Sequence, residues 1–215
     1  MQVDPVGEVM RDDSRQAHWD STYATKGETG VSWFEDAPAL SLDLIRRRRA
    51  IAQSSLIDIG GGASRLVDAL LDEGMRDIAV LDLSATALDT AKARLGATAG
   101  DIEWITADVT AWEPVRTYDF WHDRAAFHFL TEPDDRAAYI ARVHAAVKPQ
   151  GHAIIATFAP DGPERCSGLP VMRYDPSTLA GVVGPSFRLI DERRHVHTTP
   201  WGSAQVFQFS VFQRR

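Results

Sequence analysis

The sequence predicts a single-domain α/β fold, Rossmann-like, whose mostly parallel sheet is covered by helices on both faces. Three observations support this fold class. Short apolar runs alternate with segments of helical periodicity between residues 55 and 184. Three of these runs end at or next to an acidic residue, namely Asp58, Asp82 or Asp108. The last two apolar runs follow one another with no helix between them, so we expect one closing strand to be antiparallel.

The predicted helices are justified by the residues at their ends. Pro38 suits a first helical turn, Ser84 is a favourable N-cap, and Gly96 follows the last periodic residue of its segment. Pro149 and Gly151 are expected to stop the helix that precedes them. On this basis we predict helices over residues 14–27, 38–53, 63–74, 84–96, 133–151 and 176–184.

The predicted strands are short runs rich in aliphatic and aromatic residues, bounded by glycine or polar residues. They cover residues 55–60, 77–83, 102–108, 117–123 and 152–159, with a closing pair over 187–197 and 204–212.

The domain organisation follows from these elements. We expect a mobile N-terminus over residues 1–15 and a single domain over 16–215. Within the domain we separate the N-terminal helices and cap, the strand-rich core, and the lid with the closing strand pair, at residues 16–53, 54–160 and 161–215.

Composition and charge exclude several classes of protein. With 44% hydrophobic and 25% charged residues, the chain is typical of a globular protein. Its net charge of −7 argues against nucleic acid or an anionic membrane as a partner. We find no signal peptide, and no apolar run approaches the ~18–20 residues of a membrane span. Cys166 is the only cysteine, which fits a reducing compartment, and we expect a cytoplasmic protein.

The stretch LIDIGGGASRL, residues 56–66, is the strongest local signal for a ligand site. Gly60 lies where a strand must turn sharply into a helix, and with Gly61 and Gly62 it leaves the backbone bare for close approach. The helix that follows presents free N–H groups, and Asp58 can accept hydrogen bonds from a ligand amine or fix the loop. A purely structural turn is the alternative.

Two other nucleotide-binding patterns fit this loop poorly. A dinucleotide fingerprint needs a third glycine or a small residue where this chain has Arg65. A phosphate-binding P-loop needs Gly-Lys-Ser/Thr, which does not follow the triplet.

Acidic residues at the next two strand ends add to this signal. Asp82 can accept from both hydroxyls of a ribose, and hydrogen bonds to charged groups contribute roughly 1.5–3 kcal/mol each. Asp108 can accept from an adenine amino group, with Val109 or Leu83 against the ring. A helix cap is the alternative for Asp108.

These segments, together with YDFWHDRAAFHFL and VKPQGHAIIATF, resemble in order the motifs of class I S-adenosylmethionine-dependent methyltransferases. The resemblance covers about residues 54–160. It implies S-adenosylmethionine as the cofactor and a seven-stranded sheet of order 3-2-1-4-5-7-6 whose strand 7 is antiparallel. One departure is Ser64, which stands where the family pattern D-x-G-x-G-x-G has its third glycine.

The resemblance also implies which residues contact the cofactor. The glycine loop and Asp58 would hold the methionine part, Asp82 the ribose, and Asp108 with Val109 the adenine. We expect further cofactor contacts from residues beside these motifs, namely Leu83, His122 and Trp33. For Trp33 a place in the core is the alternative.

The candidate catalytic residues lie at the end of the fourth strand. The segment DRAAFHFL is similar to the DRGAL- or DKGTL-type segment of thiopurine, tellurite and some protein-lysine methyltransferases. Asp123 and Arg124 would shape the acceptor site, with a helix cap and a surface cation as the alternative. His128 would be a base or a packed histidine.

We expect a small acceptor, such as a thiol or chalcogen compound, because the chain has no large added substrate domain. A protein-lysine methyltransferase is one alternative, since HWDSTYATKG and SWF resemble the start of some of those enzymes. A non-catalytic adenosyl-binding module is the alternative from another class. The sequence carries no signal for an oligomeric state.

Two C-terminal features complete the predicted site. Residues 160–175, which carry Cys166, are expected to close as a lid together with the Trp33–Phe34 loop. His195 and His197 share one side of a predicted strand, a spacing that can bind a metal. No third ligand is evident from the sequence, so we assign no metal.

Overall fold

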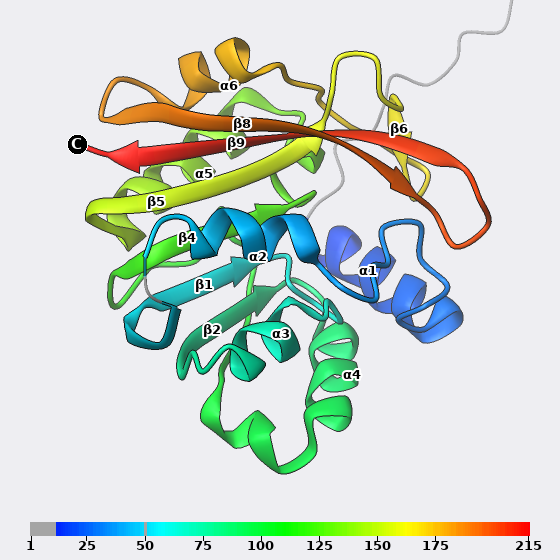
Figure 1. Ribbon diagram of the computed structural model, residues 1–215. Helices are drawn as coiled ribbons and strands as arrows, with labels where there is room; N and C mark the ends of the chain where they lie inside the picture. The colour runs from blue at the N-terminus through cyan, green and yellow to red at the C-terminus, as the bar shows by residue number, and fades with distance from the viewer. Residues whose placement is uncertain (1–11, 50) are drawn as a thin grey trace, which may run out of the picture.

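A seven-stranded sheet forms the centre of the molecule in the residues described by this computed structural model, 12–49 and 51–215 (Figure 1). Its strand order is β3-β2-β1-β4-β5-β9-β8, and β9 runs antiparallel to both β5 and β8. When the strands of this sheet alone are numbered along the chain, the order reads 3-2-1-4-5-7-6. The predicted fold class is therefore confirmed. The strands are β1 Ser55–Ile59, β2 Asp77–Asp82, β3 Glu103–Thr106, β4 Tyr118–Arg124, β5 Val147–Phe158, β8 Phe187–Thr198 and β9 Ala204–Arg214.

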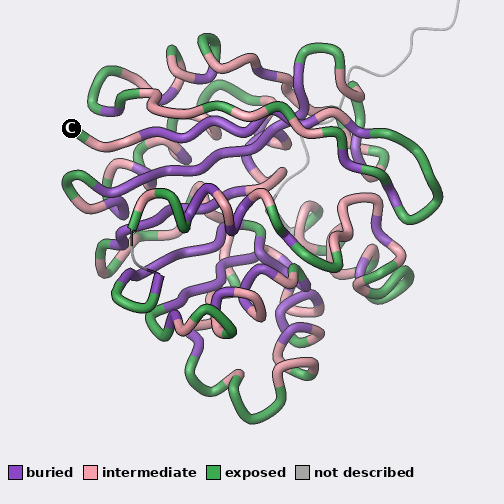
Figure 2. The backbone as a smooth tube through the Cα atoms, in the orientation of Figure 1, coloured by how far each residue is buried: buried purple, intermediate pink, exposed green. Residues whose placement is uncertain are grey.

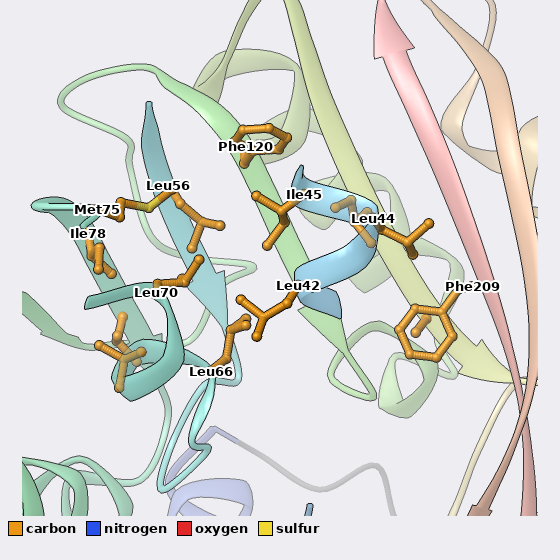
Figure 3. Packing of buried hydrophobic residues seen from close by; sticks show 14 of the residues in the cluster. Leu42, Leu44, Ile45, Leu56, Leu66, Leu70, Met75, Ile78, Phe120 and Phe209 are labelled. Atoms are coloured by element: carbon orange, nitrogen blue, oxygen red, sulfur yellow. The ribbon is translucent and has the colours of Figure 1, made fainter. Parts of the chain in front are cut away.

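Helices cover both faces of the sheet, as the alternating sequence pattern predicts. On one face, Leu44, Leu66 and Leu88 from three helices join a buried cluster with Leu56 and Phe120 of the sheet (Figure 3). The α-helices are α1 Asp12–Lys26, α2 Ala39–Arg46, α3 Leu66–Asp72, α4 Ala85–Leu95, α5 Pro133–Ala146 and α6 Pro176–Val183. Short 3-10 turns occur at η1 Ile51–Gln53, η2 Gly96–Asp101 and η3 Phe127–Phe129. A two-stranded hairpin, β6 Arg165–Cys166 and β7 Leu169–Pro170, stands outside the main sheet.

The opposite face packs against α5 and α6. Ile57 of β1 and Trp121 of β4 join Tyr139 and Leu179 of these helices in a second buried cluster. Successive strand residues therefore enter opposite clusters, which is why the central strands read as continuous apolar runs. Figure 2 shows these strands as the buried centre of the molecule.

Two predicted helix ends were wrong. The helix expected over residues 38–53 ends at Arg46, and only η1 follows in the described part of that segment. The helix expected over 133–151 ends at Ala146, where β5 begins. β5 pairs with β4 at Val147 and again from His152, and residues 148–151 form an irregular stretch between them. Within that stretch the ammonium group of Lys148 lies 2.9 Å from the Asp119 carboxylate.

The N-terminal segment is only partly described. Residues 1–11 of the predicted mobile segment lie outside the described residues, whereas residues 12–15 form the start of α1. Among the described helices, none is long and apolar enough to span a membrane.

Candidate active site

The glycine loop after β1 is packed so closely that side chains are excluded. Gly60 and Gly62 have positive φ angles of 63° and 42°. A Cβ atom on Gly60 would lie 2.7 Å from the Ala126 Cβ, and one on Gly61 would lie 2.7 Å from an Asp58 carboxylate oxygen. A Cβ on Gly62 would meet the Asp82 carboxylate at 2.8 Å. Gly62 thus makes room for a neighbouring side chain, which differs from the ligand approach predicted for it.

This packing predicts unequal costs for two glycine substitutions. Gly60→Ala should destabilise the protein by roughly 1–3 kcal/mol more than Gly96→Ala. Gly96 is the matched control, because it has a similar φ of 59° but open space around a built Cβ. Urea unfolding of both variants measures the difference, and equal losses would show that positive φ alone sets the cost.

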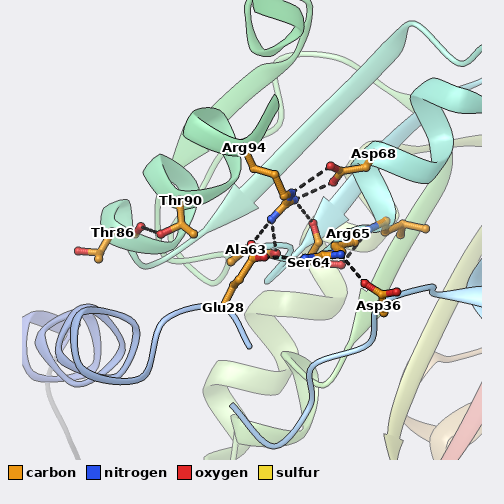
Figure 4. Close-up of polar contacts among 10 residues, drawn as sticks. Glu28, Asp36, Ala63, Ser64, Arg65, Asp68, Thr86, Thr90 and Arg94 are labelled. Carbon is orange, nitrogen blue, oxygen red and sulfur yellow. Dashed lines mark hydrogen bonds and ion pairs between the residues drawn. The ribbon is translucent and has the colours of Figure 1, made fainter. Parts of the chain in front are cut away.

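An ion-pair network fixes the outer side of the glycine loop (Figure 4). Arg94 of α4 donates to the Ser64 carbonyl at 2.9 Å and pairs with Asp68 at 2.7 Å. Glu28, from the loop after α1, accepts from Arg94 at 2.5 Å and from Arg65 at 2.8 Å. Arg65, the residue that breaks the dinucleotide fingerprint, therefore ties the N-terminal loop to the glycine loop.

Two cavities meet above the C-terminal ends of the central strands. The strand-end cavity has a volume of about 130 Å³ and lies over β2 and β3, and the glycine-loop cavity of about 40 Å³ lies over β1 and β4. All predicted cofactor residues except Gly62 line one or both of them. Residues common to both cavities are Tyr23, Trp33, Gly60 and Arg124.

Asp82 is a buried carboxylate in the wall of the strand-end cavity. It is 8% exposed, and its Oδ1 accepts from the Ser84 backbone N–H at 2.7 Å. Burial raises the pKa of Asp82 to about 7; the bond from Ser84 opposes this rise, and the nearby Asp58 and Asp20 charges add to it. Such a carboxylate gains from hydroxyl groups that approach it through the cavity.

Asp108 is held more firmly than the sequence suggests. Its Oδ1 accepts from the Thr110 backbone N–H at 2.7 Å and from the Thr110 hydroxyl at 2.6 Å, as a turn cap does. Its Oδ2 pairs with Arg15 of α1 at 3.0 Å. An adenine amino group would share this carboxylate with Arg15, while Val109 and Leu83 line the cavity as predicted.

Asp58 lies in a hydrogen-bonded chain that reaches the glycine-loop cavity. Its Oδ1 lies 2.7 Å from His122 Nδ1, and His122 Nε2 lies 2.9 Å from the Ser41 hydroxyl. If the carboxylate accepts from Nδ1–H, Nε2 accepts from the Ser41 hydroxyl, so both ring nitrogens have a partner. Ser41 was not identified from the sequence, because it comes from α2 and no local motif marks it.

Comparison with known proteins agrees with this architecture. A family model for a methyltransferase domain matches residues 56–151. A methyltransferase from Anabaena variabilis, described as S-adenosylmethionine-dependent, superposes with a TM-score of 0.74 at 14% identity, over 97% of this chain and 96% of that chain. The chain therefore carries a methyltransferase domain over residues 56–151, in the fold of S-adenosylmethionine-dependent enzymes. No match was found among curated proteins.

Two further solved structures share the fold of the methyltransferase. One is the 1,6-didemethyltoxoflavin-N1-methyltransferase of Burkholderia thailandensis with bound 1,6-didemethyltoxoflavin and S-adenosylhomocysteine, with a TM-score of 0.64, 19% identity and coverage of 99% and 93%. The other concerns the conversion of a disulfide bond into a thioacetal group during echinomycin biosynthesis. Its TM-score is 0.72 at 18% identity, with coverage of 93% of this chain and 91% of that chain.

The donor set of the methyltransferase fits its cofactor, S-adenosylmethionine. The strand-end cavity combines the buried Asp82 carboxylate with apolar side chains, which suits a ribose joined to an aromatic base. The glycine-loop cavity combines acidic and basic side chains, Asp58 and Glu35 with Arg65 and Arg124, which suits the ammonium and carboxylate groups of an amino acid.

Arg124 and Asp123 occupy different environments in the methyltransferase. Arg124 lines both cavities, donates to the Trp33 carbonyl at 2.8 Å, and pairs with Glu35 at 3.0 Å. Asp123 is fully buried and accepts from the Ala126 backbone N–H at 2.8 Å. It also accepts from the Tyr139 hydroxyl at 2.6 Å. Asp123 therefore caps the turn after β4, which was the alternative to a site-shaping role, and a catalytic role for it stays a prediction.

His128 is a packed histidine, which was the alternative to a base. It is fully buried between the rings of Phe129 and Phe158, with centroids 4.5 and 4.8 Å away. Burial, aided by the Arg124 charge, lowers the pKa of His128 to about 3. The imidazole is therefore neutral throughout the physiological range.

The His128 environment predicts a silent titration. Because the folded-state pKa is about 3 and the unfolded value is about 6.5, the ring signals of His128 should not shift between pH 8 and pH 5. The stability contributed by the neutral ring is present above pH ~6.5 and is lost as the pH falls towards 3. Histidine-selective NMR measures this, with the urea-unfolded chain as the titrating control; a folded-state midpoint near 6.5 would contradict the packing argument.

Three segments cover the cavities of the methyltransferase. Trp19 of α1 lies edge-to-face against Trp33 and Phe129, with ring centroids 5.7 and 4.9 Å away. Cys166 of the β6–β7 hairpin lines the strand-end cavity, and Phe34 lines the glycine-loop cavity. Both predicted lid segments thus contribute a wall, and Trp19 of α1 adds another to the strand-end cavity.

Proposed function

We propose that this methyltransferase transfers the methyl group of S-adenosylmethionine to a small thiol or chalcogen compound. In this proposal the strand-end cavity binds the adenosyl part, through Asp82, Leu83, Asp108 and Val109. The glycine-loop cavity binds the amino-acid part, through Asp58, Gly60, Gly61, His122 and Trp33. Gly62 supports the loop, and Arg124 lies at the junction where the acceptor would enter.

The enclosure of the site is the observation that carries this proposal. Trp19, Trp33 and Cys166 come from three separate segments, yet all three line the strand-end cavity. These walls would cover the bound adenosyl part and narrow the approach to the transferred methyl group at the junction beside Arg124. A narrow approach suits a small molecule, whereas a lysine on a protein surface needs an open groove. Enclosure excludes water and holds the acceptor in line with the transferred methyl group.

The chemistry of the walls also suits the transfer of a methyl group from a positively charged sulfur. S-adenosylmethionine supplies a methyl group activated on a positively charged sulfur. The rings of Trp19, Trp33 and Phe129 line the strand-end cavity, and an aromatic face within about 6 Å stabilises a cation by about 0.5–2 kcal/mol. Burial raises the pKa of the Cys166 thiol to about 11, so this sulfur stays protonated and does not compete with the acceptor.

Two structures of similar fold support a small acceptor. One of them holds 1,6-didemethyltoxoflavin, a small heterocycle, and the other concerns a sulfur-centred conversion in echinomycin biosynthesis. We extend the chemistry of the second to this chain as part of the proposal.

A labelled-methyl screen tests the acceptor class. Purified protein is incubated with labelled S-adenosylmethionine and three acceptor sets, which are aliphatic and aromatic thiols, inorganic selenium and tellurium oxyanions under reducing conditions, and lysine-containing peptides. We expect label on at least one thiol or chalcogen compound and none on the peptides. Asp82→Asn, which impairs the expected ribose contact, is the control for cofactor-dependent transfer.

The outcomes distinguish a small-acceptor enzyme from a protein-lysine methyltransferase and from an adenosyl-binding module. Label on peptides alone would replace the small-acceptor proposal with a protein-lysine methyltransferase. Cofactor binding without transfer to any of the three sets, or to a small-molecule extract, would favour an adenosyl-binding module.

A further inference from the structure

Glu35, His195 and His197 converge on one point beside the glycine-loop cavity. The two histidines alternate along β8 and face the same side, while Glu35 comes from the loop before α2. Glu35 Oε1 lies 3.5 Å from His195 Nε2 and 3.4 Å from His197 Nδ1. One ligand atom from each of the three residues lies within 4.8 Å of the other two.

These separations match a tetrahedral metal site. Ligand atoms about 2.0–2.2 Å from a zinc ion lie about 3.3–3.6 Å from one another in a tetrahedron. Both measured distances from Glu35 fall in that range. The sequence offered only the histidine pair; the third ligand is supplied by the fold, which brings the N-terminal loop against β8.

A backbone contact prepares His197 for coordination. Its Nε2 lies 2.7 Å from the Ser32 carbonyl oxygen, which can only accept, so Nε2 carries the proton. In the neutral imidazole, Nδ1 then presents its lone pair towards Glu35. A metal-binding histidine almost always donates its other ring N–H in this way, to a carbonyl or a carboxylate.

The three side chains differ in exposure to solvent, and the most exposed of them, His195, leaves a route for an ion. His195 is 35% exposed, Glu35 19% and His197 4%. An open cavity lined by Phe34, Glu35 and His197, among others, adjoins the cluster. An ion can therefore enter from solvent and keep one position for water or another ligand.

We propose that Glu35, His195 and His197 bind a divalent transition-metal ion of borderline softness, such as Zn²⁺. Two imidazoles and one carboxylate favour zinc, cobalt or nickel over magnesium or calcium, which take oxygen ligands. The bound ion ties β8 to the Ser32–Glu35 segment, whose Trp33 lines both cavities. This site adjoins the glycine-loop cavity, which Glu35 also lines, but it does not depend on the identity of the acceptor.

Arg124 adds a positive charge next to the proposed metal ion, so a further negative ligand is needed. The Glu35 side chain is 19% exposed, and its carboxylate already pairs with the Arg124 guanidinium. Arg124 lies 3.0 Å from Glu35 Oε1 and competes with the ion for that oxygen. An anion in the fourth position, such as hydroxide or a thiolate, offsets the added positive charge.

Metal binding to the tag-free full chain tests the proposal. After treatment with a chelator and its removal, Zn²⁺ is titrated calorimetrically, and Co²⁺ is added separately for visible absorption. We expect one ion per chain, a tetrahedral cobalt spectrum, and a rise in the unfolding temperature with Zn²⁺ concentration. The variants His195→Ala, His197→Ala and Glu35→Gln should each weaken binding at least tenfold. His144→Gln, on α5, is the matched control and should bind as the wild type does.

X-ray absorption of the zinc-loaded wild type gives a second measurement that does not depend on the folding of any variant. We expect nitrogen and oxygen neighbours with the scattering pattern of two imidazoles. Absence of saturable binding, equal binding by all variants, or a first shell without imidazole would each overturn the proposed site.

Discussion

Replacing Asp82 with asparagine is expected to stabilise the cofactor-free protein at pH 8 while weakening its affinity for S-adenosylmethionine. Asp82 is 8% exposed, and burial raises its pKa from 3.8 to about 7. At pH 8 the folded protein therefore carries a buried charge that costs stability, and asparagine removes the charge at nearly the same volume. One pKa unit corresponds to about 1.4 kcal/mol, so the expected gain is about 1–4 kcal/mol.

The pH dependence of this gain follows from the raised pKa. The folded protein binds the Asp82 proton more tightly than the unfolded chain does, because the pKa is about 7 when folded and 3.8 when unfolded. The wild type therefore has its full stability below pH 3.8 and loses this contribution as the pH rises through about 7. The difference between Asp82→Asn and wild type should thus be largest at pH 8 and should vanish near pH 4. Urea unfolding at several pH values measures it.

The affinity loss and its control complete this test. Loss of a charged acceptor for the ribose hydroxyls should weaken S-adenosylmethionine or S-adenosylhomocysteine binding by about 10- to 100-fold. Asp119→Asn is the matched control, at the opposite end of the sheet. Burial raises the pKa of Asp119, but its contacts with Lys148 and Ser55 outweigh this and lower it. That variant should lose stability at pH 8 and keep its cofactor affinity; a stability loss in Asp82→Asn as well would contradict our account of Asp82.

The cofactor side of the site could be predicted because its residues stand in local motifs. Asp58, Asp82 and Asp108 each follow an apolar run, and parallel strands bring their carboxyl ends to one edge of the sheet. Two details were still missed. The bare backbone of Gly62 admits the Asp82 side chain, and Arg15 already pairs with Asp108. Both depend on contacts between segments that no local spacing encodes.

Other parts of the site could not be predicted in the same way, because distant segments build them. Ser41 reaches His122 from a separate helix, and Glu35 reaches His195 and His197 from 160 or more residues away in the chain. The type of a residue also does not show whether it is catalytic or structural. Asp123 and His128 had the side chains of catalytic groups, yet both are fully buried in the layer beneath the site.

Among substitutions outside the predicted cofactor-binding residues, Arg124→Met is expected to reduce methyl-transfer activity most. Arg124 projects from the end of β4, donates to the Trp33 carbonyl at 2.8 Å, and pairs with Glu35 at 3.0 Å. Together with the contact between His197 and the Ser32 carbonyl, it links the sheet to the loop that covers both cavities. Without it, Glu35 loses its guanidinium partner at a site where its side chain is 19% exposed, which should cost about 3 kcal/mol.

The fall in kcat/KM of Arg124→Met should be larger than its loss of folding stability can explain. A covering loop displaced by about 1 Å can slow a positioned reaction by roughly 10²-fold, so kcat/KM of Arg124→Met should fall by that order at a temperature where the variant is fully folded. Arg124→Lys should recover only part of this loss, because an ammonium group cannot serve both acceptors with the planar geometry of a guanidinium. Arg116→Met, at the opposite edge of the sheet where Arg116 pairs with Asp77 and Glu103, controls for loss of an arginine and should leave kcat/KM unchanged. Methyl transfer to the acceptor identified in the screen gives the measurement, and a value for Arg124→Met within twofold of the wild type would show that the loop is held in place without Arg124.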